Sequence, residues 1–218
     1  MSKTPSTGYT FMFAAVICVV CSLVVSSAAT LLKERQERNV RIDIQKNILG
    51  AVGLKAATPE EVEALYAARI KELSVTDAKL PLYVREDDGK PIAYAFPISG
   101  KGLWSTLYGY LALEPDGDTI KGISFYKHGE TPGLGAEIEK AWFQTNFIGK
   151  KCLADDGTLA SISVVKGKVT DSIAPNLQKH FVDGISGATL TSRGVTDLVR
   201  AGLERYSPFL ASLQKEKR

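Results

Sequence analysis

Asp183-Gly184-Ile185-Ser186-Gly187-Ala188-Thr189-Leu190-Thr191-Ser192 places two glycines and four hydroxyl side chains directly before a helical pattern. The apolar residues of that predicted C-terminal helix are Val195, Leu198, Val199, Leu203 and Tyr206. Free N–H groups at a helix N-terminus favour a phosphate. One helix cap uses one hydroxyl, so four exceed that need. The stretch predicts a phosphate-binding helix start, while a plain turn with Thr191 or Ser192 as the cap is the second interpretation.

A second glycine-rich stretch, 129–135, reads Gly-Glu-Thr-Pro-Gly-Leu-Gly. Its Gly133-Leu134-Gly135 segment would allow the backbone to approach a planar or phosphorylated ligand closely. The stretch is not a Rossmann fingerprint, because Ile138 occupies the position of the third glycine and no βαβ unit surrounds it. Taken alone, it is typical of a turn between a strand and a helix.

The composition indicates a globular protein. The chain has 218 residues, of which 44% are hydrophobic and 23% charged, and this is enough for one sizeable core. Its net charge of +3 is too small and too mixed in sign to favour nucleic acid. Three cysteines give no disulfide framework, and Cys18 and Cys21 lack the further ligands of a metal site. Whether these two contact a metal centre of a partner stays open.

The N-terminus predicts a membrane anchor. Residues 10–32 carry no charge, and about 20 apolar residues span a bilayer as a helix. Ser26-Ser27-Ala28-Ala29 could imitate the cleavage site of a signal peptide, but the apolar run is long and only Lys3 precedes it. We therefore expect an uncleaved anchor over residues 1–32. Basic residues after the span, between Lys33 and Arg41, favour a cytoplasmic location for the rest of the chain.

Two helices are expected after the anchor. Val40, Ile44, Ile48 and Val52 recur every four residues, so residues 33–57 are expected to hold a juxtamembrane helix ending near Gly50–Gly53 and a connection. Thr58-Pro59-Glu60-Glu61 is a capping box with proline in the first turn. It predicts a helix that carries Val62, Leu65 and Leu73 and ends before Pro81.

The remaining pattern predicts an α+β domain over residues 58–218. Strands are expected at 92–98, 103–113 and 119–126, with a turn at Pro115–Asp118. A short helix at 136–147 and a strand at 161–169 follow. We expect a single transmembrane helix followed by one domain, in which helices flank a mostly antiparallel sheet.

Several motifs resemble a known family. Asp183–Thr189 resembles the flavinylation motif of the FMN-binding subunits of ion-pumping bacterial redox complexes, and residues 128–135 resemble their second flavin loop. Gly100-Lys101-Gly102-Leu103-Trp104-Ser105 and Gln45–Leu49 resemble the NqrC family, which belongs to the Na⁺-translocating NADH:quinone reductase. The resemblance runs over most of the chain.

The resemblance implies a covalent cofactor. The last threonine of the motif accepts FMN as a phosphoester, made from FAD by a flavin transferase, and maps to Thr189, with Thr191 as the nearby alternative. Lys166, Lys168 and Arg193 are candidate cations, and Leu134, Trp104 and Tyr108 either pack on the flavin ring or belong to the core. The other expected FMN contacts are Ser186, Gly187, Ala188, Leu190, Thr191, Glu130, Thr131, Gly133, Leu134, Gly135 and Trp104.

The resemblance also implies a function. The chain would be an electron-transfer subunit of a membrane complex that oxidises NADH, reduces ubiquinone and translocates Na⁺. Catalysis would be shared with the other subunits, without a catalytic residue or metal of its own. The domain would lie on the periplasmic side of the bacterial inner membrane, contrary to the charge pattern. The alternatives are the G-type subunit of an Rnf electron-transport complex and, from another class, an anchored scaffold or sensor.

Overall fold

The computed structural model describes residues 6–75 and 79–215, so Lys3 and the rest of Met1–Pro5 lie outside the described residues. The chain divides into two compact units, Met1–Arg41 and Ile42–Arg218. One helix, α1 (Thr7–Ala51), runs through the boundary between them. It ends at Ala51, which confirms the helix end predicted near Gly50–Gly53.

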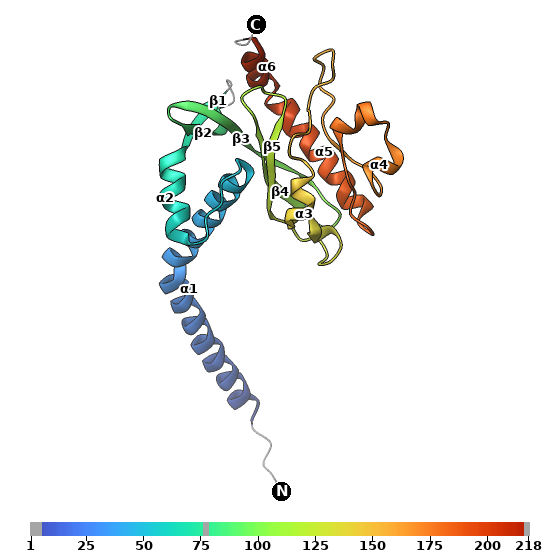
Figure 1. Ribbon diagram of the computed structural model, residues 1–218. Coiled ribbons are helices and arrows are strands. Elements are labelled where there is room, and N and C mark those ends of the chain that lie inside the picture. The colour runs from blue at the N-terminus through green and yellow to red at the C-terminus, as the bar shows by residue number, and fades with distance from the viewer. Residues whose placement is uncertain (1–5, 76–78, 216–218) are drawn as a thin grey trace. The chain divides into compact units, whose positions relative to one another are not determined.

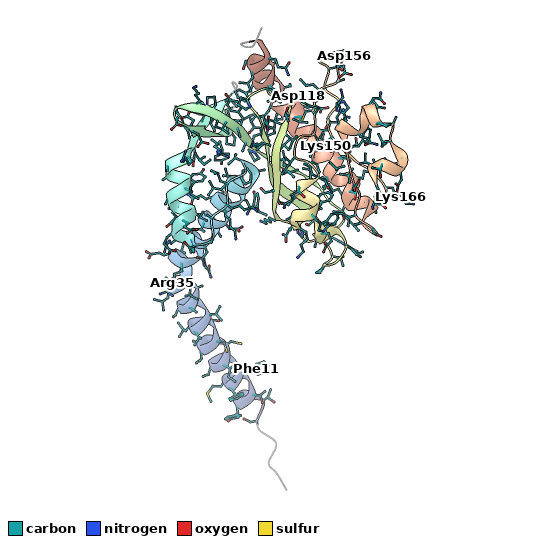
Figure 2. All side chains as sticks on the ribbon, viewed as in Figure 1. Phe11, Arg35, Asp118, Lys150, Asp156 and Lys166 are labelled. Atoms are coloured by element: carbon teal, nitrogen blue, oxygen red, sulfur yellow. The ribbon has the colours of Figure 1, made fainter. Side chains whose placement is uncertain are left out.

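The first part of α1 has the length and composition of a membrane span. Its most apolar 18-residue window has a mean hydropathy of 2.5, and none of that window is buried. Large apolar side chains on it point outward, as Phe11 does with 73% of its surface exposed (Figure 2). Such a surface is stable in hydrocarbon rather than in water.

The second helix, α2 (Pro59–Arg69), starts as predicted and ends early. Thr58 Oγ1 accepts a hydrogen bond of 3.2 Å from the Glu61 N–H, and the Glu61 carboxylate accepts one of 3.4 Å from the Thr58 N–H. The prediction of a helix up to Pro81 is wrong. Strand β1 (Ile70–Val75) begins directly after α2 and pairs with β2 (Leu80–Asp87), because antiparallel pairing outweighs the helical spacing of the apolar residues.

Five strands form one antiparallel sheet in the order β1-β2-β3-β4-β5. The last three are β3 (Lys90–Lys101), β4 (Thr106–Leu113) and β5 (Ile120–Lys127). The strand predicted from residue 103 starts at Thr106 instead, because the Gly102 N–H donates to the Ser105 carbonyl at 2.8 Å and turns the chain. Trp104 therefore lies in the loop between β3 and β4 rather than in a strand.

Side-chain alternation gives the sheet two buried faces. Phe96, Ile98 and Leu111 pack in the core that includes α5 (Thr189–Arg205) on one face. Ala95 and Ala112 pack on the other face, with α2 and the end of α1 (Figure 1). The helix α5 lies very close to β3, and a Cβ on Gly194 would stand 2.4 Å from the Lys101 carbonyl oxygen. This packing fixes the start of α5 beside the loop between β3 and β4.

The segment between β5 and α5 is less regular than predicted. A 3₁₀ helix (Gly135–Glu139) and α3 (Ala141–Thr145) replace the single helix expected at 136–147. The strand expected at 161–169 shrinks to β6 (Ser163–Val164), which pairs in parallel with β7 (Phe181–Val182). Gly167, with a φ of +82°, turns the chain into α4 (Val169–Ser172). A second 3₁₀ helix (Pro175–His180) precedes β7, and α6 (Ser207–Lys215) ends the described chain. The predicted α+β fold, with a mostly antiparallel sheet flanked by helices, is confirmed.

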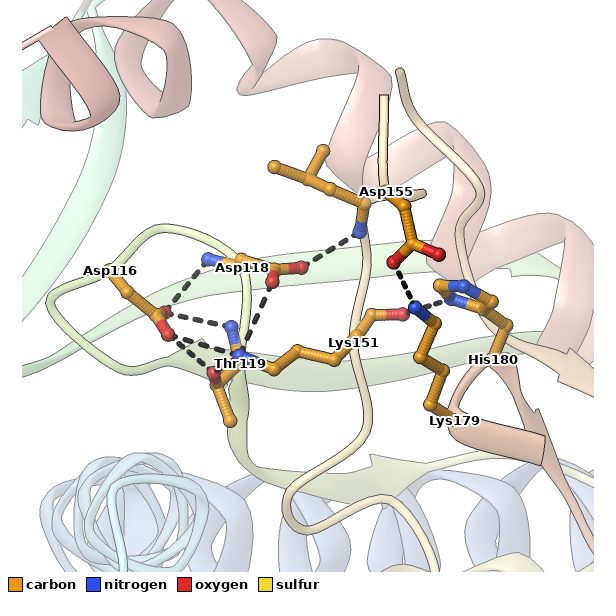
Figure 3. A network of polar contacts seen from close by, with 8 residues as sticks. Asp116, Asp118, Thr119, Lys151, Asp155, Lys179 and His180 are labelled. Carbon is orange, nitrogen blue, oxygen red and sulfur yellow. Dashed lines mark hydrogen bonds and ion pairs between the residues drawn. The ribbon is translucent and has the colours of Figure 1, made fainter. Parts of the chain in front are cut away.

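A polar network fixes the turn between β4 and β5 (Figure 3). Asp116 Oδ1 accepts hydrogen bonds from the N–H groups of Asp118 and Thr119 at 2.9 and 2.8 Å. Lys151 Nζ lies 3.4 Å from Asp116 Oδ2 and 3.3 Å from Asp118 Oδ2. Burial raises the pKa of Asp116, but hydrogen bonds from Thr119 and Asp118 and the charge of Lys151 outweigh it and lower that pKa to about 2.

Candidate functional site

The first turn of α5 leaves donors free. Ala188 is the N-cap residue, with no side-chain capping bond, and the Ser192 N–H makes the first bond of the helix, 2.9 Å to the Ala188 carbonyl. The N–H groups of Thr189, Leu190 and Thr191 precede this ladder and have no acceptor within the helix. The second interpretation, with Thr191 or Ser192 as the cap, is therefore wrong.

The two threonines of this turn differ in environment. Thr189 is exposed, whereas only 1% of the Thr191 surface is exposed. Thr191 Oγ1 donates a hydrogen bond of 2.5 Å to Glu130 Oε2, so its hydroxyl is enclosed and engaged. Of the two hydroxyls, Thr189 is the one that a large group could reach.

Two cavities meet at Thr189, and their volumes of about 630 and 350 Å³ fall within or near the usual range for small-molecule sites. Thr189, Ile185 and Lys166 line both. The larger one is also lined by Trp142, Gly167, Lys168, Asp183, Gly184, Ser186 and Gly187. The smaller one is also lined by Ser163, Val164, Val165, Leu190, Ser192, Arg193, Thr196 and Asp197.

The donors around Thr189 suit a phosphate. Lys166, whose exposed side chain is labelled in Figure 2, lines both cavities, while Lys168 and Arg193 line one each. Ser192 lines the smaller cavity, and its buried hydroxyl has no hydrogen-bond partner among the described residues. A buried hydroxyl without a partner is costly, so its position favours an external acceptor. Apolar Ile185, Leu190 and Trp142 beside these donors fit the flat ring of FMN as well.

Glu130 belongs to the glycine-rich loop of residues 129–135, and its side chain packs against the loop between β3 and β4. The Glu130 side chain is buried, its Oε1 accepts a bond of 3.0 Å from the Trp104 N–H, and the Glu130 N–H donates to His128 Nδ1 at 3.1 Å. A Cβ on Gly102 would stand 2.6 Å from Glu130 Oε1, and one on Gly135 would stand 2.7 Å from Glu130 Oε2. Gly135 therefore packs closely against Glu130 and Thr191 of its own chain, and its contact with FMN stays a prediction.

The expected FMN contacts divide into two groups. Ser186, Gly187 and Leu190 line the cavities at Thr189, while Ala188 is buried beneath them. Leu134, 41% exposed, lies against Gly187, where an added Cβ would stand 2.8 Å from Leu134 Cδ2. Neither cavity is lined by Glu130, Thr131, Gly133, Gly135, Trp104 or Thr191.

The aromatic candidates also separate. The Trp104 side chain is 70% exposed and lies in the loop whose backbone binds Glu130. The ring centroids of Tyr108 and Tyr126 are 6.3 Å apart, and Lys127 Nζ lies 5.5 Å from the centroid of the Tyr108 ring. Tyr108 lines neither of the two cavities. Trp142 and Ser163 are cavity residues that the sequence did not predict, since neither lies in a recognisable motif.

Comparison with known proteins identifies the family of this chain. The FMN-binding domain family matches residues 102–204, which include both glycine loops and the start of α5. The Na(+)-translocating NADH-quinone reductase C subunit of Pseudomonas aeruginosa is 36% identical over 261 aligned residues, covering 99% of this chain and 99% of that protein. The corresponding protein of Yersinia pestis is 35% identical, covering 96% and 94%.

Solved structures give the same result. The structure of the corresponding protein from Parabacteroides distasonis has a TM-score of 0.72 at 34% identity, covering 82% of this chain and 96% of that one. The Shewanella oneidensis NqrC structure has a TM-score of 0.70 at 28% identity, covering 83% and 99%. These matches favour the NqrC family over the Rnf alternative. The chain therefore belongs to the NqrC family of the Na(+)-translocating NADH-quinone reductases, as a membrane-anchored subunit with an FMN-binding domain.

Proposed function

We propose that this chain transfers electrons through an FMN held covalently on the Thr189 hydroxyl, within a complex that oxidises NADH, reduces ubiquinone and translocates Na⁺. The observation that carries the proposal is the contrast in the first turn of α5. Thr189 is exposed between two cavities, and Thr191 is enclosed and bonded to Glu130. An FMN bound there supplies electron transfer through its ring, which attachment by the phosphate leaves unmodified.

The attachment requires a second protein. A flavin transferase would bring FAD to the exposed threonine, and Thr189 Oγ1 would bond to the phosphorus of the FMN half. The bond from that phosphorus to the AMP half breaks, AMP leaves, and the hydroxyl proton passes to a base or to solvent. No oxidant is needed.

This chain's own residues would hold the phosphate and the ring. The N–H groups of the first turn of α5 and the positive end of its dipole favour the phosphate charge. Lys166 lines both cavities, so it would add a positive charge near the phosphate whichever cavity the FMN occupies. Ser186, Gly187, Ala188 and Leu190 shape the wall around Thr189, and Leu134 borders it. Glu130, Thr131, Gly133, Gly135, Thr191 and Trp104 would support this wall from behind.

The proposed location is the bacterial inner membrane. Residues 1–32 would form the tail and the span, residues 33–57 the connection, and residues 58–218 the FMN-binding domain on the periplasmic side. Protease added to intact spheroplasts should digest the domain. Digestion only in inside-out vesicles would assign it to the cytoplasm, as the basic residues after the span suggest.

Covalent flavin is the direct test. The full chain, produced with a flavin transferase, should fluoresce as a flavoprotein after denaturing electrophoresis. Thr189→Ala should remove the fluorescence, while Thr189→Ser, which keeps a hydroxyl, should retain it. Fluorescence that persists in Thr189→Ala would move the attachment to another residue. Colourless wild-type protein would favour the anchored scaffold or sensor.

A further inference from the structure

The Glu130 carboxylate separates the two threonine hydroxyls of the first turn of α5. Glu130 is 5% exposed and Thr191 is 1% exposed, and the contact joins residues 61 positions apart in the chain. We propose that Glu130 is a positioning residue that makes Thr189, rather than Thr191, the acceptor of FMN. This inference rests on the proposed function and assigns its selectivity to one side chain.

The surrounding loops leave room for this carboxylate. Gly102 and Gly135 lie so close to it that a Cβ on either would stand under 3 Å from a Glu130 oxygen. Both oxygens are engaged, Oε1 by the Trp104 N–H and Oε2 by the Thr191 hydroxyl. Burial alone would raise the pKa of Glu130, but the bond from Thr191 and the N–H groups of residues 103–105 outweigh it and lower that pKa. The side chain is therefore an anion that ties three segments together.

The geometry of the α-helix links the Glu130–Thr191 hydrogen bond to the orientation of Thr189. Successive residues of an α-helix are rotated by about 100°, so residues two apart point in nearly opposite directions. When Glu130 holds Thr191 inward, Thr189 must point outward, toward the two cavities. A pyrophosphate can reach the Thr189 oxygen there.

The rival role for Glu130 is that of a base. A carboxylate 2.5 Å from a hydroxyl could remove its proton and make Thr191 the nucleophile. Thr191 lines neither cavity, and both groups are buried. A flavin phosphate could reach this pair only if the residues that bury it moved away. The geometry therefore favours positioning.

The test measures both the rate and the residue of attachment. Full-length apo protein in detergent is incubated with FAD and a flavin transferase, and the attachment site is mapped by peptide mass spectrometry. The variants are Glu130→Gln, Thr191→Val and Thr191→Ser, with Glu114→Gln as the control. Glu114 pairs with Lys121 at 3.6 Å outside the site, so this control removes one carboxylate charge elsewhere.

Positioning predicts a specific pattern. Glu130→Gln and Thr191→Val should lower the maximal rate of attachment at Thr189 on the order of tenfold, the size expected from losing one charge-assisted hydrogen bond, with little change in the KM for the apo protein. Thr191→Ser restores the hydroxyl and should restore the rate, and Glu114→Gln should behave as wild type. A smaller folded fraction would raise the apparent KM for the apo protein, so an unchanged KM separates positioning from a folding defect.

The contrary outcomes are distinct. Flavin on Thr191 in wild-type protein would overturn the inference and make Glu130 the base. Unchanged rates at Thr189 in both Glu130→Gln and Thr191→Val would overturn the inference and leave the proposed function intact. Wild-type protein without covalent flavin would overturn the proposed function itself, and the inference with it.

Discussion

Two turns of this domain each hold a carboxylate against a threonine hydroxyl, and they differ in what the contact closes. Asp116 bonds Thr119 three residues away and has Lys151 beside it, so the contact closes one local turn (Figure 3). Glu130 bonds Thr191 across 61 residues, and hydrogen bonds hold its charge. The first contact fixes a connection between strands. The second joins the loop of residues 129–135 to the first turn of α5, where the proposed acceptor Thr189 lies.

The largest effect on stability is expected at the second contact. Glu130→Ala leaves the buried Thr191 hydroxyl and the partly buried Trp104 N–H without their acceptor. We expect the free energy of unfolding to fall by about 3 kcal/mol. Urea unfolding of the full chain in detergent measures this change. A loss below about 1 kcal/mol would mean that the loops do not depend on this carboxylate.

Gly133 and Gly135, in the same loop as Glu130, test whether close packing against Glu130 and Thr191 contributes to stability. Gly135→Ala places a Cβ 2.6 Å from Thr191 Oγ1, and overpacking of this kind costs about 2 kcal/mol. Gly133, at a φ of +73°, has open space where its Cβ would be, so Gly133→Ala should cost about 1 kcal/mol from backbone strain alone. Urea unfolding compares the two. Equal losses would show that packing against Glu130 adds nothing.

A smaller effect is expected at the local turn. Asp116→Asn keeps an acceptor for the two backbone N–H groups but removes the charge beside Lys151. We expect a loss of about 1.5 kcal/mol, since the network is partly exposed. Flavin attachment at Thr189 should be unchanged in this variant. A defect in attachment would remove the distinction between the two turns.

The pH dependence should give the smallest signal. The pKa of Asp116 is about 2 in the folded protein and 3.8 in a model peptide, so its contribution is present above about pH 4 and is lost as the pH falls toward 2. After allowance for solvent screening, this contribution is about 1 kcal/mol. Unfolding of wild-type and Asp116→Asn protein at pH 5 and pH 2.5 should show the difference between them shrinking at low pH. A constant difference would place the stabilisation elsewhere.

The sequence predicted local features well and non-local ones poorly. The end of α1, the capping box at Thr58 and the start of α5 within residues 183–192 depend on nearby residues, and the sequence predicts all three. Strand β1 follows a helix whose apolar spacing continues through Leu73, so only its pairing with β2 reveals it. The short β6 likewise depends on a partner 18 residues away. Propensity cannot report such pairings.

The same division holds at the site. The resemblance and the hydroxyls of residues 183–192 indicate Thr189 and Thr191, but the hydrogen bond that engages Thr191 alone comes from Glu130 on another loop. The pattern of residues 129–135 predicts a ligand contact but does not indicate that Gly135 lies directly against Glu130 and Thr191. Trp142 enters the cavity from α3 without any motif. Contacts across 60 residues are set by the fold, and a single sequence does not display them.

The mass of the peptide that contains Thr189 tests the central claim most directly. Protein purified from cells with a flavin transferase is digested and fragmented, so that each hydroxyl of 186–192 is assigned separately. The account predicts one FMN group, less one water, on Thr189 and an unmodified Thr191. Modification of Thr191, or an unmodified peptide throughout, would contradict it.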